Sequence, residues 1–176
     1  SGSQTQSTPQ EPITSPAATG SESPQATSTS DLTVLETTDA YTRYEHRITS
    51  PNGSLYGELY VPAGSDTRTM VIMSHSFSGT HSEMTPLAER LARVGTASYV
   101  YDFVGGSTSS ASGNDTTRMS VLTEKADLNA VFNAIQTLDV VDASNIFLLG
   151  ASQGGYVSAL EAVDLKDRIA GLILYF

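Results

Sequence analysis

The sequence predicts an α/β protein with a mostly parallel sheet and helices on both of its faces. From residue 70 onward, short apolar runs alternate with segments whose apolar residues recur at helical spacing. The apolar runs are continuous rather than alternating, which is typical of strands covered on both faces. Strands that alternate with helices pair in parallel through right-handed crossovers. An antiparallel hairpin is predicted ahead of this region.

The composition excludes several classes of function. Nine Lys and Arg stand against nineteen Asp and Glu, a formal net charge of -10. A surface this acidic repels phosphate groups, so we expect no nucleic-acid partner. Without cysteine there is no disulfide, thiolate metal site or thiol nucleophile. The histidines and carboxylates lack ligand spacing, no dinucleotide fingerprint occurs, and no apolar run is long enough to span a bilayer. We therefore expect neither a metal nor another cofactor.

Residues 1–31 are predicted to form a disordered tail or linker, and residues 32–176 the folded domain. The tail is rich in Ser, Thr, Pro and Gln, and it holds four of the seven prolines. Such a segment buries too little apolar surface to offset the entropy of ordering it. It is typical of spacers that hold bacterial exported enzymes off the cell envelope, so we expect an exported protein. A passive tail is the alternative.

The first strands of the domain are predicted from alternation. Apolar and polar residues alternate over 44–48 and over 55–61, on either side of Asn52-Gly53, which is a strong hairpin turn signal. We expect an antiparallel pair with one face toward solvent. His46 lies in this alternation and is interpreted as an ordinary strand residue.

The alternating strands and helices follow in order. The apolar runs expected to form parallel strands span residues 70–73, 97–101, 145–149 and 169–176. Helices are expected over 85–94, from about residue 120, and over 153–163. Thr85 is expected to cap the first helix, with Pro86 at its first helical position and Gly95 at its end.

The central motif follows the third of these runs. The residues Gly150-Ala151-Ser152-Gln153-Gly154 fit G-x-S-x-G, the nucleophile elbow between a strand and a helix. The motif predicts a positive φ at Ser152, which lifts its hydroxyl above the sheet. It also requires glycine at 150 and 154, because a Cβ at either position would collide where strand and helix pass closest. A glycine-rich turn with an incidental serine is the alternative, and the flanking strand and helix favour the elbow.

Oxyanion donors are predicted at the carboxyl ends of the strands, where ligands bind in such sheets. A tetrahedral intermediate of acyl transfer needs hydrogen-bond donors for its oxyanion. The elbow supplies the backbone N–H of Gln153, at the start of a helix whose dipole favours negative charge. The loop His75–Gly79 supplies the second donor, which we assign to the N–H of Phe77.

Three segments together resemble the α/β-hydrolases, specifically the group of cinnamoyl and feruloyl esterases and related carboxylic-ester hydrolases. His75-Ser76-Phe77-Ser78-Gly79 resembles H-G-F-x-G, the segment Tyr101–Ser107 resembles Y-D-F-x-G-x-G-x-S, and Gly150–Gly155 resembles G-x-S-Q-G-G. The match covers roughly residues 42–176. It implies a serine carboxylic-ester hydrolase with Ser152 as nucleophile and hydroxycinnamoyl or related small acyl esters as substrates. The sequence departs from the pattern at Ser76 and in lacking a histidine near Gly105.

The resemblance also implies an acid and a histidine after the serine, and these are missing. The residues after Ser152 contain Asp164 and Asp167, both expected as solvated loop charges, and no histidine. His75 is expected to steady its loop and His81 to be a solvated residue at a helix entry. A serine hydroxyl without an adjacent base is a weak nucleophile.

We therefore expect the front part of an α/β-hydrolase domain, incomplete at its C-terminal edge. Its last apolar run would form a bare sheet edge. The expected partners are a small-molecule ester and a missing C-terminal segment, or a second chain, that carries the acid and the histidine. The alternatives are a non-catalytic binding module of the same fold, and the same fold with lyase or perhydrolase chemistry.

Overall fold

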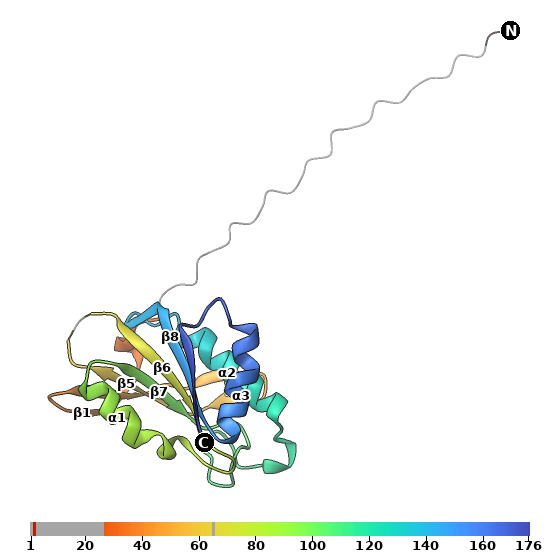
Figure 1. Ribbon diagram of the computed structural model, residues 1–176, viewed down its shortest axis with the longest axis horizontal. Helices are drawn as coiled ribbons and strands as arrows, with labels where there is room; N and C mark the ends of the chain where they lie inside the picture. Colours follow the sequence, from red (N-terminus) through yellow and green to blue (C-terminus); the bar gives the residue numbers. More distant parts are fainter. Residues whose placement is uncertain (1, 3–26, 65) are drawn as a thin grey trace.

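The computed structural model describes residues 2, 27–64 and 66–176 (Figure 1). Most of the predicted tail therefore lies outside the described residues. In the described end of this predicted tail, Thr27 pairs with Leu138 in an isolated parallel bridge, and the 3₁₀ helix η1 spans Thr29–Asp31. Among the described residues, backbone contacts with the domain thus extend back to Thr27, whereas the domain was predicted to begin at residue 32.

The described residues form a mixed seven-stranded sheet in the order β1-β2-β5-β7-β6-β8-β9. Strands β7, β6, β8 and β9 are mutually parallel, whereas β1, β2 and β5 add an antiparallel half. This confirms the predicted α/β class. The strands span Thr33–Thr37 (β1), Tyr41–Glu45 (β2), Gly57–Pro62 (β5), Arg68–Ser74 (β6), Ala97–Tyr101 (β7), Val141–Ala151 (β8) and Gly171–Tyr175 (β9).

The N-terminal hairpin forms, but it is smaller than expected. Strands β3 (Ile48–Ser50) and β4 (Gly53–Leu55) flank the Asn52-Gly53 turn as a separate two-stranded sheet. The long antiparallel partner of β5 is β2, and β5 is buried along its whole length because it lies between β2 and β7. The expectation of a solvent-facing side on this strand was therefore wrong. His46 lies between β2 and β3 and not within a strand, with its ring edge-on to Tyr99.

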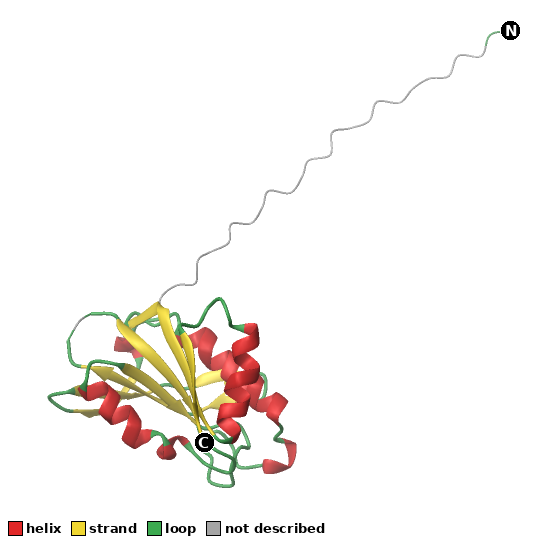
Figure 2. Cartoon of the chain, viewed as in Figure 1, coloured by secondary structure: helices red, strands yellow, loops and turns green. Residues whose placement is uncertain are grey.

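Among the described residues, three α-helices cover the sheet, one on one face and two on the other (Figure 2). They span Thr85–Arg93 (α1), Val121–Ile135 (α2) and Gln153–Asp164 (α3). Ser120 caps α2 in a capping box with Thr123. The chain enters α1 directly from the 3₁₀ helix η2 (His81–Glu83), so the cap position falls on Met84 and not on Thr85 as predicted. Gly95 follows α1 with a φ of 88°.

Each face of the sheet has its own apolar layer. Ile72 of β6 faces the layer under α2 and α3, whereas its neighbours Val71 and Met73 face the layer under α1. Successive side chains of a strand point to opposite faces, so a strand covered on both sides needs apolar residues throughout. Each fully buried side chain of this kind contributes roughly 1.5–3 kcal/mol. This explains why the sequence shows continuous runs here.

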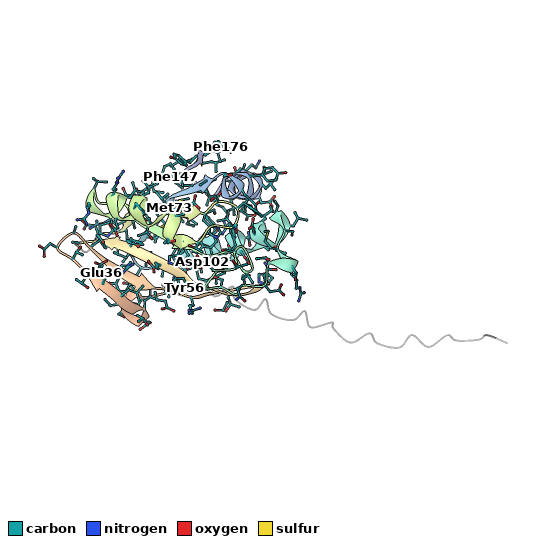
Figure 3. All side chains as sticks on the ribbon, turned by 90° about the horizontal axis from the view of Figure 1, so that it is seen from below. Glu36, Tyr56, Met73, Asp102, Phe147 and Phe176 are labelled. Atoms are coloured by element: carbon teal, nitrogen blue, oxygen red, sulfur yellow. The ribbon has the colours of Figure 1, made fainter. Side chains whose placement is uncertain are left out.

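The sheet ends at β9 with an exposed apolar edge. Strand β9 pairs in parallel with β8, and within the described residues no strand pairs with its other side. Its side chains and that of Phe176 are largely exposed. Figure 3 shows Phe176 at the upper margin of the molecule, with Glu36 toward the lower left. An apolar edge of this length is a template for another strand.

Candidate active site

The nucleophile elbow has the backbone that its motif predicts. Strand β8 ends at Ala151, α3 begins at Gln153, and Ser152 between them has φ 48° and ψ -115°. A non-glycine residue in this conformation stores roughly 1–3 kcal/mol of strain. The side chain is exposed, and the Ser152 N–H donates to the Tyr175 carbonyl of β9 at 2.9 Å. Ser152 is thus held at a sharp corner with its hydroxyl facing outward.

Close backbone contacts build this corner. A Cβ at Gly150 would lie closer than 3.0 Å to the Gly154 carbonyl oxygen, and a Cβ at Gly154 would lie equally close to the carbonyl oxygens of Ser74 and His75. Real Cβ atoms essentially never approach so closely. The helix therefore passes directly over the ends of β8 and β6, which brings the elbow against the start of the 75–79 loop.

That loop presents the second predicted amide. The Gly79 N–H donates to the Ser76 carbonyl at 3.0 Å, which closes a turn with Phe77 and Ser78 at its corner, and Ser78 has φ 60°. Glu83 anchors the turn by accepting the Ser76 N–H at 3.0 Å. Within the described residues, no acceptor lies within hydrogen-bond distance of the backbone N–H of Phe77 or Gln153. Two unengaged amides therefore lie at the sheet edge that carries Ser152, and their role at an oxyanion stays a prediction.

His75 is a buried structural residue of this loop. Its Nε2 accepts the Phe103 N–H at 3.2 Å, so Nδ1 carries the proton and donates to the Ser76 carbonyl at 2.8 Å. Burial lowers its pKa. A neutral imidazole with both nitrogens engaged steadies the loop and has no free nitrogen to act as a base.

His81 is not the solvated residue that the sequence suggested. Its Nδ1 lies 2.8 Å from Asp102 Oδ1, its Nε2 lies 3.6 Å from Glu58 Oε1, and its ring packs against Tyr56. The side-chain hydrogen bond to Asp102 raises the pKa of His81, although burial opposes it. The half-buried imidazole is held here because the two buried carboxylates need hydrogen-bond donors.

Asp102 joins the two loops on this side of the site. It is fully buried, and its Oδ1 accepts the His81 N–H at 2.6 Å while its Oδ2 accepts the Ala111 N–H at 2.7 Å. Burial raises the pKa of Asp102, but the hydrogen bonds from His81 and Ala111 outweigh burial, so its pKa lies below the usual range. No role was predicted for Asp102 from the sequence. Its position directly after a buried strand was the signal that could have identified it as a site residue.

A second buried carboxyl group lies behind the elbow. Glu124 of α2 is buried, and its Oε2 accepts the Gln153 Nε2–H at 2.7 Å. Burial raises the pKa of Glu124 to about 7, the Gln153 bond lowers it, and the charge of Asp127 raises it. Glu124 and Asp127 lie on the same face of α2 as the buried Leu128. Two carboxylates within an apolar stripe are a sequence signal that could have identified them as buried.

The acid and base of a catalytic triad are not found among the described residues. No polar group there lies within hydrogen-bond distance of the Ser152 hydroxyl. Asp164, at the end of α3, binds Lys125, and Asp167 is exposed to solvent. The described part of the chain also contains no group of three potential metal ligands, and none of its helices has the length and apolar character needed to cross a membrane.

An apolar cavity of about 480 Å³ lies between α1 and β9. Its wall includes Met84 and Leu87 from the helix side and Ile173 and Tyr175 from the strand. Tyr175 is also the residue whose carbonyl holds the Ser152 N–H. The exposed edge of the sheet thus adjoins both an apolar cavity and the elbow.

The chain matches a known protein family. The model of the family described as serine aminopeptidase, S33, matches residues 65–175. A comparison with curated proteins returns no match.

Solved structures share the fold. Est1E from Butyrivibrio proteoclasticus, solved with ferulic acid bound, is 24% identical with a TM-score of 0.65, over 72% of this chain and 50% of that chain. The α/β-hydrolase GrgF from Penicillium is 22% identical with a TM-score of 0.65, over 75% and 45%. The acetyl xylan esterase from Paenibacillus is 17% identical with a TM-score of 0.65, over 82% and 53%. The chain spans about half the length of these proteins.

Proposed function

Because the chain belongs to the serine aminopeptidase S33 family and has the α/β-hydrolase fold, we propose that it is the nucleophile-bearing part of a serine hydrolase. The resemblance to α/β-hydrolases expected from the three sequence motifs is confirmed. The finer proposal is a carboxylic-ester hydrolase that forms an acyl-enzyme at Ser152.

One observation carries this proposal: the strained, outward-facing position of Ser152. Its φ of 48° turns the side chain outward at the carboxyl end of β8, and the proposed oxyanion donors are the backbone amides of Gln153 and of Phe77, which lies on the loop after the neighbouring strand β6. Backbone strain is retained where the surrounding structure enforces it, and it clusters at functional sites. A serine with a merely structural role has no need of this conformation.

The proposed reaction proceeds in two steps. Ser152 Oγ attacks the ester carbonyl carbon and loses its proton to a base, and the carbonyl oxygen becomes an oxyanion that accepts hydrogen bonds from Phe77 and Gln153. The tetrahedral intermediate expels the alcohol, which takes up a proton, and leaves an acyl-serine. Water then attacks the acyl-serine and releases the carboxylic acid. Within the described residues, both His75 and His81 are engaged elsewhere, so the base is proposed to lie on a further polypeptide segment.

We propose that a further polypeptide segment completes the site by pairing with β9. This segment, a continuation of this chain or a second chain, would supply the acid and the histidine. The exposed apolar edge of β9 and the adjoining cavity of about 480 Å³ support this proposal, because both are apolar surfaces that a strand and its connection would cover.

The proposed substrates are small acyl esters, including hydroxycinnamoyl esters. The resemblance of the motifs to feruloyl esterases and the fold shared with Est1E, solved with ferulic acid bound, support this choice. The family description points to aminoacyl amides as the second class, which undergo the same acyl transfer. An exported location is proposed from the composition of residues 1–31 alone.

A non-catalytic binding module of the same fold is the alternative. It is favoured by the lack of any described hydrogen-bond partner for the Ser152 hydroxyl. In that case the elbow would bind a ligand or partner without covalent chemistry.

A fluorophosphonate probe separates the two functions. We expect it to label Ser152 in the folded chain, faster once a completing segment is added, and not in the urea-unfolded chain or in Ser152→Ala. Turnover of methyl ferulate, p-nitrophenyl acetate and an aminoacyl p-nitroanilide then ranks the substrate classes. Absence of labelling, with and without the completing segment, would establish the binding module.

A further inference from the structure

The carboxyl group of Glu124 lies directly behind the proposed oxyanion hole. Glu124 is in the first turn of α2, is 2% exposed, and accepts the Gln153 side-chain N–H at 2.7 Å. Gln153 is the first residue of α3 and follows Ser152 in the chain. The carboxyl group therefore contacts the side chain of the same residue whose backbone N–H is proposed to bind the oxyanion.

A second carboxyl group at the same helix interface shows what is unusual about Glu124. Glu161 of α3 is 1% exposed, accepts the Asn129 Nδ2–H at 2.6 Å, and forms an ion pair with Lys125 at 3.1 Å. Glu124 makes a similar bond to an amide, but among the described residues no cationic side chain lies within ion-pair distance of it. Its charge is therefore uncompensated.

An uncompensated buried carboxyl group opposes folding near neutral pH. The titratable groups that influence Glu124 are Asp127 on its own helix and the phenol of Tyr101 on β7, neither of which is cationic. Burial raises its pKa from 4.5 to about 7, so stability falls as the pH rises between these two values. A purely structural position is better filled by a neutral residue, whereas groups that cost stability are typical of functional sites.

Given the proposed function, we propose that Glu124 is a positioning residue for the oxyanion hole. No side chain caps the start of α3, where Ser152 occupies the cap position. The bond from Gln153 to Glu124 therefore ties the first turn of α3 to α2. This tie fixes the direction of the Gln153 backbone N–H relative to the Ser152 hydroxyl, and catalysis by preorganised donors depends on such directions.

Two substitutions of similar volume test this role. Glu124→Gln keeps an oxygen that accepts the Gln153 N–H, whereas Glu124→Met fills the same space without an acceptor. Glu161→Met is the matched control, because it removes a carboxyl–amide bond of the same kind from a position farther along α3, together with the ion pair to Lys125. We expect the rate of fluorophosphonate labelling at Ser152 to fall about tenfold or more in Glu124→Met, and to stay within about threefold of the unsubstituted chain in the other two.

A second measurement does not depend on reactivity. In ¹⁵N NMR of the full chain, the side-chain and backbone amide resonances of Gln153 should shift with an inflection near pH 7, and Glu124→Gln should abolish it. The backbone order parameter of Gln153 should drop from about 0.85 to below about 0.6 in Glu124→Met and stay high in Glu161→Met.

The outcomes separate the two proposals. If the unsubstituted chain is never labelled, the hydrolase proposal fails, and the NMR measurements still decide whether Glu124 orders Gln153. If it is labelled and Glu124→Met is labelled equally fast, Glu124 has no positioning role and the hydrolase proposal stands. Equal losses in Glu124→Met and Glu161→Met would show a general packing effect and overturn the positioning role.

Discussion

Two walls of the same site are held by different physical means. At the elbow, backbone packs directly on backbone, and Gly150 and Gly154 leave no room for a side chain. On the opposite wall, buried polar groups hold the loops, with Asp102 at the centre and His81 bonded to it. The elbow is therefore limited by close steric contact, whereas the loop wall depends on buried charges and their hydrogen bonds.

The largest expected effect is steric. Gly154→Ala places a Cβ against the backbone of β6, which cannot yield without separating α3 from the sheet. We expect a loss of more than about 4 kcal/mol in the free energy of unfolding, measured by urea titration.

Gly95→Ala provides the control for this prediction. Gly95 has a positive φ, but a Cβ there meets nothing within 4 Å. Gly95→Ala should lower the free energy of unfolding by only about 1 kcal/mol, because it adds backbone strain alone. Equal losses in the two variants would show that strain and not close packing governs the elbow.

The second largest expected effect tests the loop wall, formed by Asp102 and His81. Asp102→Ala removes the acceptor of two backbone amides and of the His81 ring, all of them at least partly buried. Leaving such donors unpaired should cost about 3 kcal/mol in the free energy of unfolding. Asp167→Ala, on the exposed surface, should change it by less than about 0.5 kcal/mol. A loss below about 1 kcal/mol in Asp102→Ala would mean that the network does not hold the loops.

The third effect is the pH dependence of the same wall. The pKa of His81 is raised, so its contribution is fully present below about 6.5 and is lost as the pH rises through the folded value. The pKa of Asp102 is lowered, so its contribution is present above about 3.8 and is lost as the pH falls through the folded value.

We therefore expect the stability difference between the unsubstituted chain and His81→Gln to be largest near pH 5–6 and smaller at pH 8. Unfolding of both proteins at pH 5.5, 7 and 8 measures it. Taking the difference cancels the titration of Glu124. A difference that grows toward pH 8 would contradict the ion pair.

The smallest expected effect is a change of backbone strain in the 75–79 loop. Ser78 has φ 60°, so Ser78→Gly relieves strain in the folded loop but adds freedom to the unfolded chain. We expect the melting temperature to change by no more than about 2 °C, equally at pH 6 and pH 8. A change of several degrees would mean that the turn carries more strain than its backbone angle implies.

The same contrast explains what the sequence could predict. The elbow depends on residues close together in the chain, so the motif alone placed Ser152 at its corner and glycine at 150 and 154. The parallel strands were predictable because burial on both faces forces continuous apolar runs. A local signal also predicted the end of α1 at Gly95, whereas the predicted cap at Thr85 was wrong because the preceding 3₁₀ helix moves the cap position to Met84.

The contacts between buried polar side chains were not predictable, because the residues that make them come from distant parts of the chain. Glu58 alternates with apolar residues and was assigned to solvent, but β5 lies inside the sheet and Glu58 is buried. His81 reaches Asp102 across 21 positions, and Gln153 reaches Glu124 across 29. Only the tertiary structure brings such pairs together. The sequence positions of Asp102 and Glu124 mark them as unusual, but they do not identify the partners that these carboxylates bind.

The bond between the Ser152 N–H and the Tyr175 carbonyl has a mechanical consequence. The last strand of the described sheet is tethered to the backbone of the proposed nucleophile, and a strand paired on one side only opens more easily than an inner one. Each opening of β9 therefore releases one restraint on the elbow. Clamping β9 between two neighbours would lengthen the lifetime of the strained corner without touching the serine itself.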